Sequence, residues 1–123
     1  MKKILVAEDN PASREFLLEL LSAQGYHVTA AEDGESALKQ AKEEPPDLLL
    51  LDIQMPGMDG YEVLRRLRAE AQTAKLRIVA CTAYAMSGDE EKAIAAGFDG
   101  YITKPIRAAA LRTQIEKIFA TGN

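Results

Sequence analysis

The chain has 123 residues, which is enough for one domain with its own core and too few for two ordinary domains. Hydrophobic residues make up 47% of the chain and charged residues 28%, so the composition indicates a soluble globular protein and excludes a disordered one. The formal net charge of −4 argues against broad electrostatic binding to nucleic acid, which requires a basic surface.

Two further features indicate a cytoplasmic protein. The single cysteine, Cys81, cannot form an internal disulfide, which suits a reducing compartment. The first residues, MKKILVAEDN, contain too short an apolar run for a signal peptide or a membrane span. We therefore expect one domain over residues 1–123, with no output domain, no membrane contact and no direct nucleic-acid contact.

In the first half of the chain, short apolar runs alternate with helical patterns. The expected strands are Lys3–Ala7, His27–Ala31 and the leucine run Leu48–Leu51, which ends at Asp52. The first expected helix has Asn10 as its cap and Pro11 at its first position, and it ends at Gly25. Its core face carries Phe16, Leu17, Leu20 and Leu21. A second helix is expected over Glu35–Lys42, after the turn at Asp33 and Gly34.

The second half continues the alternation. Asp59 and Glu62 predict a capped helix through about Glu70, and Ser87 and Glu90 predict a capping box for a helix that ends at Gly97. The expected strands are Leu76–Cys81 and Asp99–Thr103. The expected inward-facing residues are Tyr61, Leu64 and Leu67 in the third helix, and Leu111, Ile115, Ile118 and Phe119 in a fifth helix over Arg107–Phe119.

Five strand–helix units with short connections predict an α/β fold with a five-stranded parallel sheet and helices on both faces. We expect the flavodoxin-like strand order 2-1-3-4-5, in which the first and third strands are neighbours. Because ligands bind beyond the carboxyl ends of such strands, this order brings Glu8 and Asp9 close to Asp52.

Carboxylates gathered at one edge of the sheet predict a metal site. Glu8, Asp9 and Asp52 would repel one another, and a divalent cation removes that conflict. Oxygen ligands of this kind favour Mg²⁺. Thr82 and Lys104 also follow strands, and a hydroxyl, an ammonium and a metal together suit a phosphoryl group carried by Asp52.

With Glu8-Asp9, the stretch Leu48–Gly60 (LLLLDIQMPGMDG), Thr82-Ala83 and Lys104-Pro105, the chain resembles the receiver domain of two-component response regulators from about Lys3 to Phe119. The resemblance implies the role of each site residue. The implied phosphoacceptor is Asp52, and the implied direct ligands of Mg²⁺ are Asp9, Asp52 and the backbone carbonyl of Gln54. Glu8 would act mainly through metal-bound water. The phosphoryl group would be contacted by Thr82, Ala83 and Lys104, and a cis peptide would join Lys104 to Pro105.

The resemblance also implies a conformational switch, in which Thr82 moves toward the phosphate and Tyr101 turns inward. The fourth helix, the fifth strand and the fifth helix then present a changed surface to a downstream protein target. Gln54 and Tyr84, two residues beyond Asp52 and Thr82, tune how fast the phosphate is lost. The ordinary alternative for Tyr101 is a half-buried strand tyrosine with no such role.

The partners implied are a sensor histidine kinase or a histidine phosphotransfer protein, and the protein itself is a monomer or a phosphorylation-promoted dimer. It is a phosphoprotein that assists its own phosphorylation and dephosphorylation, and not an enzyme. A terminal regulator and a phosphorelay intermediate both fit the sequence. The beginning and the short tail favour a stand-alone regulator over a receiver excised from a larger hybrid kinase.

Other classes fit less well. A phosphatase of the haloacid-dehalogenase type also forms an aspartyl phosphate, but it needs a second Asp two residues after the nucleophile, where this chain has Gln54. Neither nucleotide-binding glycine motif is present. We interpret His27 as a surface residue and Cys81 as a packing residue.

Overall fold

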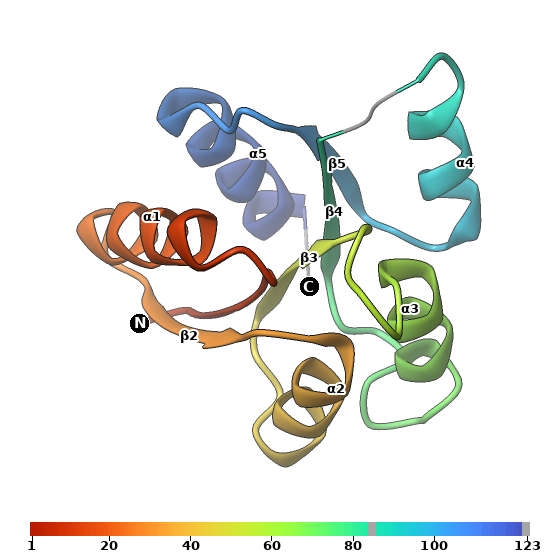
Figure 1. The fold of residues 1–123 in the computed structure, drawn as a ribbon. Coiled ribbons are helices and arrows are strands. Elements are labelled where there is room, and N and C mark those ends of the chain that lie inside the picture. Colours follow the sequence, from red (N-terminus) through yellow and green to blue (C-terminus); the bar gives the residue numbers. More distant parts are fainter. Residues whose placement is uncertain (84–85, 122–123) are drawn as a thin grey trace.

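A computed structural model gives the fold, and it describes residues 1–83 and 86–121. The strands are β1 (Lys3–Ala7), β2 (His27–Ala31), β3 (Leu48–Asp52), β4 (Ile78–Thr82) and β5 (Gly100–Thr103). The helices are α1 (Pro11–Ala23), α2 (Gly34–Glu43), α3 (Gly60–Arg68), α4 (Asp89–Ala96) and α5 (Ala108–Thr121). All neighbouring strands are parallel and their order is β2-β1-β3-β4-β5, so the predicted fold is confirmed (Figure 1).

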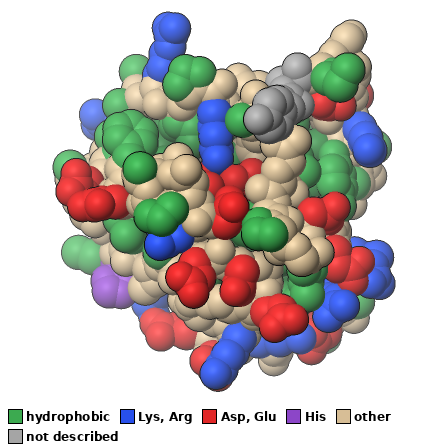
Figure 2. Space-filling view, viewed as in Figure 1, with side chains coloured by type: hydrophobic (Ala, Val, Ile, Leu, Met, Phe, Trp, Pro, Cys, Tyr) green, Lys and Arg blue, Asp and Glu red, His purple; other side chains and the backbone are tan. Residues whose placement is uncertain are grey.

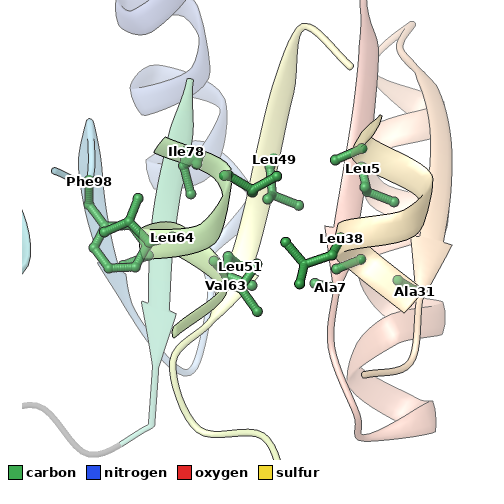
Figure 3. Packing of buried hydrophobic residues seen from close by; sticks show 14 of the residues in the cluster. Leu5, Ala7, Ala31, Leu38, Leu49, Leu51, Val63, Leu64, Ile78 and Phe98 are labelled. Atoms are coloured by element: carbon green, nitrogen blue, oxygen red, sulfur yellow. The ribbon is translucent and has the colours of Figure 1, made fainter. Parts of the chain in front are cut away.

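The sheet separates two hydrophobic layers. Alternate residues of each strand point to opposite faces, and the two sets pack against different helices. On one face, Leu5, Leu49 and Ile78 pack with Leu38 of α2 and Leu64 of α3 (Figure 3). The other face packs against α1 and α5 through Ile4, Val6, Leu48, Leu50, Val79, Leu17, Leu21, Leu111 and Ile115. Because both faces are covered, β3 is buried along its whole length, including Asp52.

Three helices begin after a side-chain cap, which the sequence predicts at Asn10 and Asp59; Asp33, predicted as part of a turn, is the third cap, so α2 begins at Gly34 rather than Glu35. Asn10, Asp33 and Asp59 each accept a hydrogen bond from the backbone N–H three residues later, at 2.9, 2.8 and 3.0 Å. The capping pair of α3 is only half formed, because the Glu62 carboxylate pairs with Arg65 and Arg66. The chain therefore leaves the sheet after β1, β2 and β3 through turns that side-chain oxygens hold.

The capping box predicted at Ser87 and Glu90 is wrong. Gly88 occupies the N-cap of α4 at φ +90°, and no side chain of a described residue caps this helix. The Asp89 carboxylate instead accepts the backbone N–H of Met86 at 2.7 Å, which turns the chain before the helix rather than capping it. As a result α4, which buries only Ala93, is weakly fixed at the end nearer to the functional site.

Phe16 is not a core residue, contrary to the prediction. Leu17 and Leu21 lie one helical turn apart and are buried, whereas Phe16 points to one side of that stripe and is 47% exposed. Several boundaries also differ from the prediction. α3 ends at Arg68 rather than Glu70 because the Thr73 hydroxyl donates to the Leu67 carbonyl at 2.6 Å. β4 begins at Ile78 because this residue pairs with Leu49.

The remaining differences are small. Tyr61 is only partly buried, and its ring stacks edge-on against Phe98. In α5, Leu111 and Ile115 are fully buried, while Ile118 and Phe119 pack at the margin of the core. In the described part of the chain, no helix is long and apolar enough to cross a membrane.

Arg68 joins segments that are distant in sequence. Its guanidinium donates to the carbonyl of Leu76 before β4, to the carbonyl of Gly97 after α4 at 2.9 Å, and to Asp99 at 3.1 Å. The same Asp99 oxygen accepts the N–H of Ile78 at 2.8 Å. One side chain thus holds the end of α3, the starts of β4 and β5, and the turn that ends α4.

We predict that Arg68→Met lowers the free energy of unfolding by about 2 kcal/mol, because carbonyls and a carboxylate lose a charged donor. The matched control is Arg66→Met, which removes only an exposed ion pair to Glu62 and is expected to cost less than about 0.5 kcal/mol. Denaturant unfolding measures both values. Equal losses in the two variants would contradict the role assigned to Arg68.

Candidate functional site

The candidate site lies at the edge of the sheet where the parallel strands end. Asp52 is the last residue of β3 and pairs with Cys81 of β4, while Ala7 at the end of β1 pairs with Leu51. Glu8 follows β1 directly, so the order β1-β3-β4 places it beside Asp52. Acidic side chains gather on this side of the molecule (Figure 2).

Three carboxylates meet at this edge. One ligand oxygen from each of Glu8, Asp9 and Asp52 lies within 4.8 Å of the others. Glu8 and Asp52 are buried, at 2% and 5% exposure, and Asp9 is exposed. The structure therefore brings together the three acidic residues that the sequence predicts for a metal site.

One ammonium bridges the two buried carboxylates. Lys104 Nζ donates to Glu8 Oε1 at 2.5 Å and to Asp52 Oδ2 at 2.9 Å. The second oxygen of Glu8 accepts the N–H of Asn10 at 3.1 Å, and Asp52 Oδ1 accepts the N–H of Gln54 at 3.0 Å. Each buried carboxylate is thus held at both oxygens.

The charges at this edge do not balance. Burial raises the pKa of Glu8 above its ordinary value, and the hydrogen bond from Lys104 only partly offsets that effect. Burial alone lowers the pKa of Lys104, but its hydrogen bonds to Glu8 and Asp52 outweigh this and raise it, so the ammonium stays charged. Three carboxylates facing one ammonium leave about two negative charges, which matches a divalent cation.

The loop after β3 closes tightly on the strand. Gly57 lies at φ +80°, a conformation that favours glycine, and the N–H of Gly60 donates to the Ile53 carbonyl at 2.8 Å. A Cβ atom on Gly60 would lie 2.7 Å from Ile53 Cα and 2.8 Å from the Asp52 carbonyl oxygen. Glycine is therefore required at position 60, where α3 begins against the backbone that carries Asp52.

Thr82 and Lys104 end the neighbouring strands. Thr82 is the last residue of β4 and is 3% exposed, and its carbonyl accepts the N–H of Lys104 at 2.8 Å. Ala83, the next residue, is exposed. The peptide bond between Lys104 and Pro105 is cis. Tyr84 lies outside the described residues.

Tyr101 lies inward in the structure. It is 9% exposed and belongs to the hydrophobic cluster on the α2–α3 face of the sheet. Its hydroxyl is buried and has no hydrogen-bond partner among residues 1–83 and 86–121. Burial is the main reason that the pKa of Tyr101 is raised, followed by the charge of Asp89. The ring therefore already lies in the inward position that the sequence analysis expected it to reach by turning, so the inward turn itself is not seen in this structure.

Two residues set aside from the sequence lie as expected. His27 is exposed at the start of β2, at the opposite end of the strands from the carboxylates. Cys81 is buried, and burial raises the pKa of its thiol to about 12, so the thiol is not a nucleophile at neutral pH.

Sequence reasoning missed two neighbours of the site. Arg14 donates to the Glu8 carbonyl at 2.9 Å, and Phe16 lines a cavity of about 340 Å³ with Glu8 and Lys104. Arg14 could have been found because it lies near the start of a helix that comes directly after two acidic residues, Glu8 and Asp9. Phe16 gave no distinct signal, because a helical pattern does not show which apolar residue the core leaves outside.

Comparisons with known proteins agree with this geometry. The family model of the response regulator receiver domain matches residues 4–116. The polar-differentiation response regulator DivK of Brucella abortus is 38% identical over 105 residues, which cover 85% of each chain.

Solved structures are similar over nearly the whole chain. A putative response regulator from Chloroflexus aurantiacus superposes with a TM-score of 0.91 at 32% identity, covering 97% of this chain and 98% of that one. The receiver domain of sensor histidine kinase PA1611 from Pseudomonas aeruginosa has a TM-score of 0.87 at 34% identity, covering 94% of this chain and 95% of that one. That structure holds a magnesium ion in its active-site cleft.

We predict that Asp9→Asn has opposite effects without and with Mg²⁺. Without metal it removes one of three mutually repelling charges and raises the free energy of unfolding by up to about 1 kcal/mol, or about 3 °C in Tm. With Mg²⁺ it removes a ligand, so the metal-dependent rise in Tm shrinks. Thermal unfolding in chelator and in excess Mg²⁺ measures both, with the exposed Glu19→Gln on α1 as the control. A variant that responds to Mg²⁺ like the wild type would remove Asp9 from the site.

Proposed function

Because the chain belongs to the family of response regulator receiver domains, we propose that it is switched by a phosphoryl group that Asp52 accepts in the presence of Mg²⁺. Receiver domains act in two-component signalling, where they interact with histidine kinases and downstream targets. The observation that carries the assignment to Asp52 is its position, buried at the end of β3 with Lys104 Nζ at 2.9 Å.

The donor in this proposal is a phosphohistidine of a sensor kinase or a histidine phosphotransfer protein. A carboxylate oxygen of Asp52 attacks the phosphorus, the P–N bond breaks, and its electron pair returns to the histidine ring. The transferred group brings charged oxygens into a site that already holds two buried carboxylates. The Lys104 ammonium, which contacts Glu8 and Asp52, would then pair with a phosphoryl oxygen. Thr82 and the backbone at Ala83 lie at the end of β4, the strand next to Asp52.

The same three carboxylates are the proposed magnesium ligands. Asp9, Asp52 and the carbonyl of Gln54 would supply direct oxygen ligands, and Glu8 would act through bound water. Bound Mg²⁺ would neutralise charge on the phosphoryl oxygens. The donor set fits this ion, because it consists of oxygen atoms whose excess negative charge one Lys104 ammonium does not balance.

Intact mass after incubation with a small acyl phosphate and Mg²⁺ tests this assignment. We expect a gain of one phosphoryl group in the wild type and none in Asp52→Asn or in chelator. Asp47→Asn is the control, since Asp47 lies before β3 at the opposite end of the strand. If Asp52→Asn still gains a phosphoryl group and another variant does not, the phosphoacceptor is not Asp52 but the residue replaced in that other variant.

The proposed docking surface for the phosphodonor lies between α1 and the segment after β5. Phe16 and Ile106 line a cavity that also contains Glu8 and Lys104, so an apolar contact there lies beside the acceptor. A histidine from a partner helix must reach Asp52 past this rim, because Asp52 itself is buried.

We predict that Phe16→Ser slows phosphoryl transfer from the protein donor at least tenfold, because an exposed aromatic at an interface contributes about 2 kcal/mol. Uptake from a small acyl phosphate should not change, since Phe16 does not contact Asp52. The comparable substitution at the exposed Ile94 of α4 serves as the control. A parallel loss with both donors would indicate damage to the site rather than a lost docking contact.

The output surface in this proposal comprises α4, β5 and α5, with Thr82 and Tyr101 as the switch. α4 lacks a side-chain cap at the end nearer Thr82 and is held by Arg68 at its other end. A phosphoryl-dependent pull on Thr82 would therefore move the weakly held end of α4 most. The same surface would bind the downstream target or a second copy of the chain.

We predict that Tyr101→Ala reduces the change in α4 amide hydrogen exchange between the unphosphorylated and phosphorylated protein by more than half, because the ring packs beneath this region. Tyr101→Phe keeps the ring and removes a hydroxyl that has no partner in the described part of the chain, so it should preserve the change. Identical exchange differences in Ala and wild type would show Tyr101 to be an ordinary core residue.

Two elements of the proposal rest on the sequence alone. Gln54 and Tyr84 are proposed to tune the lifetime of the phosphorylated state, and residues 1–123 are proposed to form a single receiver domain. Similar proteins include both the response regulator DivK and the receiver domain of a sensor kinase. A haloacid-dehalogenase-type phosphatase is not kept as a second candidate, because the receiver model matches residues 4–116.

A further inference from the structure

We propose that Arg14 is a positioning residue that holds the acidic loop after β1 in the geometry needed to bind Mg²⁺, an inference that rests on the metal site proposed above. Arg14 lies in the second turn of α1, and its side chain reaches back toward the start of that helix, as helical side chains do. Its Nη1 atom donates to the carbonyl of Glu8 at 2.9 Å and to the carbonyl of Asp9 at 3.4 Å.

Asp9 is the ligand that depends most on this contact. The Glu8 N–H donates to the Ala31 carbonyl at 3.1 Å, and both Glu8 carboxylate oxygens accept hydrogen bonds. Asp52 is part of the sheet. Asp9 belongs to no strand or helix, its side chain is exposed, and within residues 1–83 and 86–121 its one hydrogen bond comes from Arg14.

Among the described residues the Asp9 carboxylate has no hydrogen-bond partner that orients it, and we infer that its direction follows from the backbone between β1 and Asn10. The backbone N–H of Arg14 also donates to the Asn10 carbonyl at 2.9 Å, so the arginine is fixed in the helix that begins at this loop. A guanidinium that binds two successive carbonyls limits how far that backbone can rotate. Residues that orient metal ligands in this way commonly change metal affinity about tenfold or more when replaced.

Charge alone would have the opposite effect. Arg14 brings a positive charge to a loop where a cation must bind, and a bystander arginine would repel Mg²⁺. Removing that charge without any loss of positioning would tighten Mg²⁺ binding, whereas losing the orientation of Asp9 would weaken it. The direction of the change in affinity therefore separates the two roles.

The test is the Mg²⁺ dissociation constant, measured by isothermal titration calorimetry on the full chain with the metal alone. We expect Arg14→Gln to weaken binding about tenfold and Arg14→Lys to weaken it as well, because a lysine keeps the charge but its side chain is one bond shorter than the path to Nη1, which makes both contacts. Arg112→Gln is the control, since Arg112 lies exposed on α5 and pairs with Glu116. It should bind Mg²⁺ like the wild type.

Tighter or unchanged binding in Arg14→Gln would overturn the proposal. If that variant does not fold in chelator, Arg14→Lys decides, and an unchanged dissociation constant there would overturn the proposal equally. Phosphoryl uptake by the wild type is followed separately by mass. A wild type that binds Mg²⁺ but takes up no phosphoryl group would contradict the proposed function while leaving the role of Arg14 to be judged from the affinities.

Discussion

The site depends on one shared ammonium. Lys104 Nζ lies between Glu8 and Asp52, two carboxylates that are almost fully buried, and neither has another cation in contact within the described residues. Burial of these acids is tolerated because the ammonium and two backbone N–H groups hold them. With Asp9 also present, the negative charge still exceeds the positive, and this excess makes the site receptive to a divalent cation.

The rest of the fold brings these groups together. The strand order β2-β1-β3-β4-β5 makes β1 a neighbour of β3, and parallel pairing puts the ends of β1, β3, β4 and β5 at one edge. Covering both faces of the sheet lowers solvent access to Glu8 and Asp52, which strengthens their interactions with Lys104. At the opposite end of the sheet, Arg68 ties α3, β4, α4 and β5, so that α4 is firmly held away from the site and weakly held beside it.

The fold and most site residues could be predicted because their signals are local. Leu48–Leu51 marks a strand buried on both faces, and Asn10 and Asp59 have side chains suited to capping. The failures involve choices that depend on packing. Phe16 fits the same apolar stripe as Leu17, and only the assembled core leaves it exposed. At the start of α4, a turn at Gly88 and Asp89 takes the place of the expected capping box, and the spacing of residues does not predict such a turn. Arg14 contacts a backbone carbonyl, and a sequence pattern does not indicate which carbonyls lie within reach of a side chain.

The most direct test of the shared ammonium is NMR observation of Lys104 Nζ in the wild-type protein, first in chelator, then with Mg²⁺, and then with Mg²⁺ and a small acyl phosphate. The account predicts that the Nζ signal moves at both steps, because the ammonium first shares its carboxylates with a cation and then pairs with a phosphoryl oxygen. The signal of Lys39 on α2 should not move. A Lys104 signal that stays unchanged while Asp52 becomes phosphorylated would contradict the central role given to this residue.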